Sequence, residues 1–159
     1  MHSKEEIFSW LSVIADPEIP VVSIEEMGML RNVAIAEDVY EIILTPTYTG
    51  CPAMGIIEAD IIALLHEKGL EKVAVKMIYD PAWTTDWMSE SAKEKMRKYG
   101  IAPPVHSSCG NLAAAEKNIA CPLCSSIKTE MLSRFGATAC KSYYKCNDCK
   151  ETFEYFKCH

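Results

Sequence analysis

Two CxxC pairs near the end of the chain constrain its fold more than any other feature. Cys121 and Cys124 form the first pair, Cys146 and Cys149 form the second, and 21 residues lie between the pairs. Two intervening residues let both thiolates of a tight turn point at one tetrahedral ion, and a hairpin of about twenty residues brings the second turn to the opposite side of that ion. The spacing therefore predicts a zinc ribbon.

The predicted ribbon leaves the identity of its metal open. Four thiolates alone do not select a metal, so iron in a rubredoxin-like site or in a cluster is the alternative to structural zinc. Reduced cysteines without metal are a poor explanation, because so small a tail cannot bury enough apolar surface to fold unaided. We expect hairpin strands at residues 128–135 and 139–145 and a third strand at 152–156. A closed site of this kind has no open position and would hold the tail together.

Three other cysteines do not belong to the CxxC pairs but lie close to them in the sequence. The spacing of Cys140 and Cys158 matches no standard motif, so we expect a buried strand residue and an exposed terminal thiol. The alternative is that these two cysteines form a second metal site together with His159. Cys109, which lies in a predicted linker, is a doubtful metal ligand.

The first hundred residues predict an α+β domain. Ser3 and Glu6 have the spacing of a capping box at the start of a helix. Apolar periodicity predicts helices at 4–15, 53–68 and 90–99 and strands at 30–36, 39–45 and 73–79. The short polar pair at 37–38 predicts a hairpin between the first two strands. The order α-β-β-α-β-α indicates a small mixed sheet with helices on one face.

Composition indicates two domains and excludes some functions. We expect domains at 1–104 and 119–159, joined by a linker of small and polar residues at 105–118. Residues 1–114 hold 9 Lys plus Arg against 17 Asp plus Glu, and residues 115–159 hold 7 against 5. An acidic first domain argues against nucleic acid as its partner. We find no membrane-length apolar run and no secretory signal, and we therefore expect a cytoplasmic protein with no membrane partner.

Cys51 is a lone thiol between a predicted strand and a predicted helix. Pro52 suits the first helical position, so the sulfur should lie at the positive end of the helix dipole. We expect this position to lower the pKa of Cys51 and to make it a nucleophile or a soft-metal ligand. A buried inert cysteine is the alternative. A hydrolase is disfavoured because His66 lies roughly 20 Å away along the helix axis.

Two further segments contain candidate functional residues. Asp16 and Glu18 flank a proline after the first helix, and they are either a functional acidic turn or ordinary turn residues. Trp83 and Trp87 follow the third predicted strand. They form either an exposed partner surface or an aromatic anchor between strand and helix.

Three segments together resemble a known family of proteins. They are residues 16–20 (DPEIP), 45–52 (TPTYTGCP) and 80–89 (DPAWTTDWMS). They resemble the small α+β family of iron–sulfur assembly factors that includes SufT-like and cytosolic cluster-targeting proteins. With the two CxxC pairs, residues 138–141 (TACK) and residues 153–158 (FEYFKC), almost the whole chain resembles the PaaD family. These are the D proteins of phenylacetyl-CoA epoxidase (ring 1,2-epoxidase) systems.

The resemblance implies a non-catalytic accessory protein of aerobic phenylacetate degradation that matures iron–sulfur clusters. The implied client is the reductase component of the epoxidase system. By resemblance, Cys51 is the functional thiol and transient cluster ligand, Asp16 and Glu18 form its acidic turn, and the four ribbon cysteines bind zinc. A homodimer that pairs two such thiols could hold a bridging cluster.

Two other functions remain open. The chain could be an adaptor that docks onto the epoxidase or the reductase and never carries a cluster. An enzyme with Cys51 as nucleophile lacks a nearby base and a cofactor loop.

Overall fold

A computed structural model describes residues 2–105 and 117–157. The chain forms two compact units, Met1–Trp83 and Thr84–His159, and each is described by itself. Neither described range contains a helix with the length and apolarity needed to cross a membrane.

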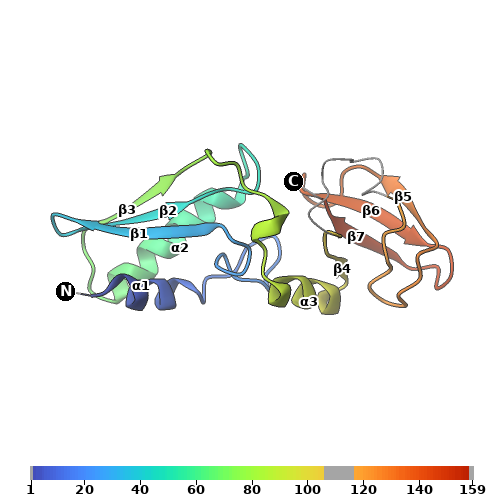
Figure 1. The fold of residues 1–159 in the computed structure, drawn as a ribbon, viewed down its shortest axis with the longest axis horizontal. Coiled ribbons are helices and arrows are strands. Elements are labelled where there is room, and N and C mark those ends of the chain that lie inside the picture. The colour runs from blue at the N-terminus through green and yellow to red at the C-terminus, as the bar shows by residue number, and fades with distance from the viewer. Residues whose placement is uncertain (1, 106–116, 158–159) are drawn as a thin grey trace. The chain divides into compact units, whose positions relative to one another are not determined.

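The first unit is a three-stranded sheet with two helices on one face (Figure 1). Its elements are α1 (Lys4–Leu11), β1 (Leu30–Ala36), β2 (Val39–Leu44), α2 (Ala53–Glu67) and β3 (Val73–Met77). The strand order is β1-β2-β3; β1 and β2 are antiparallel, whereas β2 and β3 are parallel and joined through α2. The sheet is therefore mixed, as predicted, because a parallel neighbour requires a crossover connection.

Local chemistry fixes the ends of these elements. The Ser3 hydroxyl accepts a hydrogen bond from the Glu6 amide at 3.1 Å and caps α1. Glu37 and Asp38 have φ values of 48° and 66°, the conformation that a two-residue hairpin with the correct twist requires. Gly69 has a φ of 84° and ends the segment that contains α2.

The core of the first unit lies between the sheet and the two helices, where alternate residues of β2 and one face of each helix are buried. Tyr40, Ile42 and Leu44 of β2 are buried, and their neighbours along the strand are half-buried. The helices contribute buried side chains from one face of each: Ile7 and Leu11 from α1, and Ala53, Ile57, Ile61 and Leu65 from α2. The alternation follows from the two-residue period of a strand.

Helix α1 ends at Leu11, four residues earlier than the sequence predicted. The following residues bond to a later loop instead of continuing the helix. The Asp16 amide donates to the Val22 carbonyl at 2.8 Å, and the Ile24 amide donates to the Ile14 carbonyl at 2.9 Å. Strand β3 also ends two residues earlier than predicted, at Met77.

The second unit is a four-stranded ribbon preceded by two short helical elements. Its elements are η1 (Thr85–Trp87), α3 (Glu90–Tyr99), β4 (Ile101–Ala102), β5 (Thr129–Ser133), β6 (Lys141–Cys146) and β7 (Thr152–Phe156). The strand order is β4-β7-β6-β5, with β4 parallel to β7 and the other pairs antiparallel. Helix α3 has the predicted bounds, because Ser89 caps its start and Gly100, with a φ of 93°, ends it.

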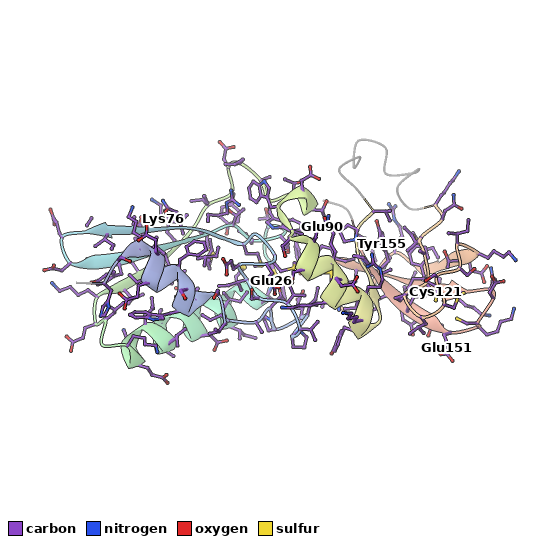
Figure 2. All side chains as sticks on the ribbon, turned by 60° about the horizontal axis from the view of Figure 1, so that its bottom comes forward. Glu26, Lys76, Glu90, Cys121, Glu151 and Tyr155 are labelled. Atoms are coloured by element: carbon purple, nitrogen blue, oxygen red, sulfur yellow. The ribbon has the colours of Figure 1, made fainter. Side chains whose placement is uncertain are left out.

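The ribbon has a small core of its own. It consists of Ala102, Ile119, Cys121, Tyr144, Cys146, Phe153 and Tyr155, of which Figure 2 labels Cys121 and Tyr155. The rings of Tyr144 and Phe153 stack with centroids 5.8 Å apart, and Tyr155 meets Tyr144 edge-on at the same separation. Such aromatic pairs add to the stability that area burial gives.

The compact units divide the chain earlier than the expected boundary at residue 104. Ile101 pairs with Glu154, and Ala102 pairs with Tyr155, so β4 belongs to the ribbon sheet. Helix α3, which contacts β4, also lies in the second unit. Most of the expected linker, residues 106–116, lies outside the described residues.

Candidate functional site

The four cysteines of the CxxC pairs converge at one end of the ribbon. The Sγ atoms of Cys121 and Cys149 are 3.8 Å apart, those of Cys124 and Cys146 are 3.5 Å apart, and all four lie within 4.8 Å of one another. A tetrahedral ion with metal–sulfur bonds of about 2.3 Å places its sulfurs roughly 3.8 Å apart. The donor set and its spacing therefore fit a zinc ion.

Backbone amides of the second CxxC turn favour the thiolate of Cys146. Amides of Cys149 and Asp148 hydrogen-bond to the Cys146 sulfur and lower its pKa to about 6. The Glu151 amide acts in the same direction on Cys149, but burial and the neighbouring thiols outweigh it and raise the Cys149 pKa to about 12. Four thiols this close do not all ionise without a cation between them, and a bound metal removes this barrier.

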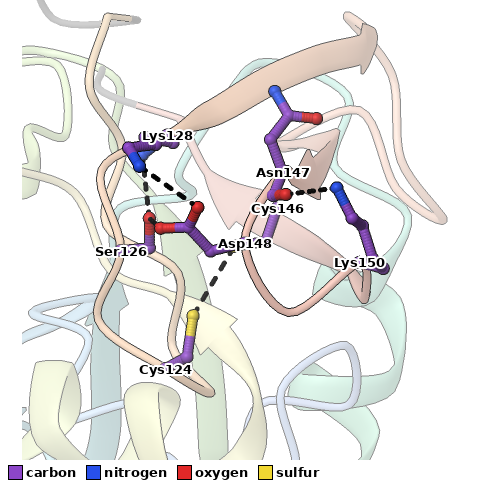
Figure 3. Close-up of polar contacts among 7 residues, drawn as sticks. All are labelled: Cys124, Ser126, Lys128, Cys146, Asn147, Asp148 and Lys150. Carbon is purple, nitrogen blue, oxygen red and sulfur yellow. Dashed lines mark hydrogen bonds and ion pairs between the residues drawn. The ribbon is translucent and has the colours of Figure 1, made fainter.

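Polar side chains connect the first and second CxxC turns (Figure 3). The Ser126 hydroxyl donates to Asp148 Oδ2 at 2.7 Å, and Lys128 Nζ lies 3.4 Å from Asp148 Oδ1. The Ser126 hydrogen bond, followed by the charge of Lys128, lowers the pKa of Asp148. These contacts tie the two turns together around the metal position, and sequence analysis missed them because they depend on how the turns meet.

The remaining cysteines divide between described and undescribed segments. Cys140 is 2% exposed, and its Sγ lies 3.0 Å from the Thr138 hydroxyl. It is buried, as we expected, but it lies in the turn before β6 and not in a strand. Cys109, Cys158 and His159 lie outside the described residues. In the part of the chain that the structure describes, the ribbon cysteines form the one group with the geometry of a metal site.

Cys51 lies two residues before the start of α2, next to the N-cap residue Pro52, at the end of the loop that follows β2. Its side chain is 8% exposed. The backbone of Ala53 and the side chain of Tyr48 hydrogen-bond to it. The Gly50 residue beside it has a φ of 81°, and no atom lies within 4 Å of where its Cβ would be, so the space around Gly50 is open.

The pKa of Cys51 is raised, and our expectation of a lowered value is wrong. Burial is the largest cause, and the negative charges of Glu18 and Asp16 act in the same direction. The hydrogen bonds from the Ala53 backbone and the Tyr48 side chain oppose the shift without overcoming it. The Cys51 side chain is therefore a neutral thiol at pH 7, and a ligand that binds sulfur must displace its proton.

The structure brings the acidic turn and Cys51 into one neighbourhood. Asp16 is 5% exposed, and its Oδ1 accepts hydrogen bonds from the amides of Glu18 at 2.7 Å and Ile19 at 3.1 Å. Asp16 thus shapes the turn, as the ordinary turn interpretation requires. Glu18 is half-buried and lies 33 positions before Cys51 in the chain, and its negative charge raises the pKa of the Cys51 thiol.

The loop before Cys51 contains a polar group that sequence analysis did not single out as buried. Thr45 is 1% exposed, and its hydroxyl has no hydrogen-bond partner within the described structure. Thr47 is also buried. A threonine at the end of a strand gives no sequence signal of its burial.

Trp83 is a buried residue of the first unit. Its side chain is 5% exposed, and its indole Nε1 donates to the Met27 carbonyl at 2.9 Å. Trp87 is half-buried in η1. The burial of Trp83 favours an anchoring role, although its partner Met27 lies in a turn, and the partner-surface interpretation of Trp83 and Trp87 stays a prediction.

Comparisons with known proteins identify both halves of the chain. Residues 106–157 match the family described as the PaaD zinc beta ribbon domain, and residues 4–77 match the family described as iron-sulfur cluster assembly protein. A protein of Escherichia coli strain K12, whose name describes it as a 1,2-phenylacetyl-CoA epoxidase subunit, is 46% identical over 153 residues. The match covers 96% of this chain and 92% of that protein. The chain belongs to the PaaD family. The resemblance inferred from its residues is confirmed.

Relatives of the first unit of this PaaD-family chain are named as assembly proteins. An Fe-S protein maturation auxiliary factor of Porphyromonas gingivalis is 32% identical and covers 58% of this chain and 89% of its own. A protein of the same description from Bacillus subtilis is 35% identical and covers 57% and 89%. The chain is therefore homologous to iron–sulfur maturation factors.

Two solved structures share the fold. A domain of unknown function from Bacillus anthracis has a TM-score of 0.54 and 27% identity, covering 58% of this chain and 90% of its own. A conserved hypothetical protein of Thermotoga maritima has a TM-score of 0.51 and 26% identity, covering 60% and 94%.

Proposed function

We propose that this PaaD-family chain is a non-catalytic accessory protein of aerobic phenylacetate degradation that carries iron–sulfur cargo on Cys51. Its client is the reductase component of the phenylacetyl-CoA epoxidase system. The observation that carries the proposal is the placement of Cys51, the acidic turn and the start of α2 together in a domain of the iron–sulfur assembly family. The name of the Escherichia coli relative supports the choice of system.

The proposed cargo binding follows from the chemistry of the thiol. Because the Cys51 thiol is neutral, cargo binding releases its proton, and the amide of Ala53 then stabilises the sulfur as a ligand. Glu18 and Asp16 favour a cationic cargo, since their charges disfavour a free thiolate but attract iron. A single thiol with few neighbouring ligands suits transient binding rather than permanent storage.

The ribbon has a separate task in this proposal. Cys121, Cys124, Cys146 and Cys149 would hold zinc in a closed site that supplies folding energy and does no chemistry. The ribbon would then present a fixed surface to the epoxidase or reductase components.

An adaptor that carries no cargo is the second candidate function. The burial of Cys51 and its raised pKa favour this candidate, because a neutral and nearly inaccessible thiol is a poor metal acceptor. In that case the chain acts only through contacts with the epoxidase or reductase.

Metal analysis separates the two functions. The wild type, Cys51→Ala and a control variant, Cys140→Ala, are purified and reconstituted anaerobically, and iron, sulfide and zinc are measured per chain. Cys140 is a matched control because it is another buried thiol outside the zinc ligands. We expect about one zinc in all three proteins, and iron in the wild type and in Cys140→Ala but not in Cys51→Ala. Zinc alone in the wild type would favour the adaptor.

The same preparations test the homodimer hypothesis. Two chains that pair their Cys51 thiols would hold one bridging cluster, with two irons or four per pair of chains. Light scattering gives the mass of the loaded protein. A monomer that keeps its cluster would rule out this arrangement.

A further inference from the structure

The outer face of helix α2 is largely apolar, although most of its residues are exposed. Of its 15 residues, 4 are polar or charged: Glu58, Asp60, His66 and Glu67. Its inner face packs in the core through Ile57 and Ile61. A stripe of exposed apolar residues with a polar border is typical of a surface that contacts a partner, so the exposed face of α2 indicates a missing contact.

Helical periodicity defines this outer face. At 3.6 residues per turn, its members are Pro52, Gly55, Ile56, Ala59, Ile62 and Ala63, with the exposed His66 on the same face at the C-terminal end of the helix. Ile56 is 54% exposed, Gly55, Ala59 and Ala63 are exposed, and Ile62 is half-buried. No atom lies within 4 Å of where a Cβ on Gly55 would be. The surface is therefore apolar, and its side chains at positions 55, 59 and 63 are small enough for the backbone of another protein to approach closely.

Acidic residues border this face on both sides. The same periodicity places Asp60 and Glu67 along one edge and Glu58 along the other. The unit to which α2 belongs is acidic as a whole, because residues 1–83 contain 5 Lys plus Arg and 14 Asp plus Glu, a formal charge of −9. A partner surface with an apolar centre and a basic border complements this arrangement.

We propose that the outer face of α2 is the docking surface for a client protein that presents an apolar patch bordered by Lys and Arg. The proposal rests on the carrier function, for which it supplies the client contact. Ile56 lies five residues after Cys51, or roughly 8 Å along the helix axis. A client that covers Ile56 and Gly55 therefore sits beside the thiol and within reach of its cargo.

Charge disfavours a second copy of the chain as the occupant. If two α2 faces came together, their acidic borders would face each other, and so would two units that each carry a formal charge of −9. Like charges placed opposite each other across an interface repel and suppress association. A partner with a basic border would be attracted to the acidic border of α2 instead of being repelled by it.

Two variants and one matched control test the surface in the full-length chain. Ile56→Lys places a cation in the apolar centre, and Asp60→Lys reverses a charge on the border. Val13→Lys is the control, because Val13 is an apolar residue of the same unit that is 73% exposed and lies outside α2. The purified reductase and epoxidase components serve as probes, and their affinities for each variant are measured by calorimetry at low and high salt. Circular dichroism checks that each variant is folded.

We expect at least one component to bind the wild type, with an affinity that falls as salt rises. Ile56→Lys should weaken binding by about tenfold or more, Asp60→Lys by a smaller factor, and Val13→Lys by less than about twofold. Equal binding by all variants, or no binding by the wild type, would overturn the proposal. A dimeric wild type that Ile56→Lys converts to a monomer would also overturn it, because the occupant would then be a second copy.

Failure of this proposal can be distinguished from failure of the carrier function. Iron loading on Cys51 is measured on the same variants without any client present. If Ile56→Lys still loads iron and binds the client normally, the docking surface is wrong and the carrier function stands. If no variant loads iron but Ile56→Lys loses the client, the docking surface stands and the adaptor function replaces the carrier.

Discussion

Replacing Trp83 by Phe tests whether this residue anchors the first unit. The substitution removes the indole N–H that donates to the Met27 carbonyl at 2.9 Å. A buried acceptor left without its partner costs about 1–3 kcal/mol. The smaller ring also buries less apolar surface, and at about 25 cal/mol per Å² a loss of roughly 40 Å² costs about 1 kcal/mol. We therefore expect the free energy of unfolding to fall by about 2–4 kcal/mol.

Urea unfolding followed by circular dichroism gives this free energy. Tyr79→Phe is the matched control, because Tyr79 is 55% exposed and its substitution should change stability by less than about 0.5 kcal/mol. A loss below about 0.5 kcal/mol for Trp83→Phe would refute the anchor. If that stable variant also failed to bind the epoxidase or reductase, Trp83 would belong to a partner surface after all.

Three further results are expected. Glu18→Gln should lower the pKa of Cys51, because it removes a negative charge that disfavours the thiolate. Mass spectrometry of the alkylated Cys51 peptide against pH would then show half-reaction at lower pH, and an unchanged profile would exclude the Glu18 effect. Glu154→Ala should lower the free energy of unfolding by about 3 kcal/mol, because it leaves the buried charge of Lys141 without its partner. The Lys141 side chain is 5% exposed, and its Nζ lies 3.0 Å from Glu154 Oε2. An unchanged free energy of unfolding would show that Lys141 reaches water. Chelation of the metal should unfold the ribbon, because structural zinc in zinc-finger peptides contributes about 10–16 kcal/mol of binding free energy to folding. Dispersed ribbon amide signals in a metal-free sample would contradict this.

Elements with strong local signals were predictable from the sequence. The bounds of α3 follow from Ser89 and Gly100, and the hairpin turn follows from Glu37 and Asp38, because neighbouring residues decide caps and tight turns. The four ribbon cysteines were predictable for the same reason, since two residues between ligands dictate one metal position.

Elements that depend on distant partners were not predictable. Strand β4 has two residues and no periodicity, and its partner β7 lies about fifty positions later in the chain. The end of α1 depends on hydrogen bonds between residues 14–16 and 22–24. No pattern in the neighbouring residues predicts the pairing of β4 with β7 or the hydrogen bonds that follow α1.

The pKa of Cys51 shows how a local argument fails at a site. The position of Cys51 before α2 was correct, and the hydrogen bond from Ala53 has the expected sign. Burial and the charge of Glu18 come from other parts of the chain, and they outweigh the helix terminus. The direction of such a shift requires the complete environment of the thiol.

Transfer to the client is the most direct test of the carrier function. The purified apo reductase component is incubated anaerobically with wild type, Cys51→Ala or Cys140→Ala, each taken through the same iron reconstitution and freed of unbound iron, and the cluster content of the reductase is measured by absorption and iron analysis. The carrier function predicts a filled reductase with the wild type and with Cys140→Ala, and an empty one with Cys51→Ala. Equal filling by all three proteins would contradict it.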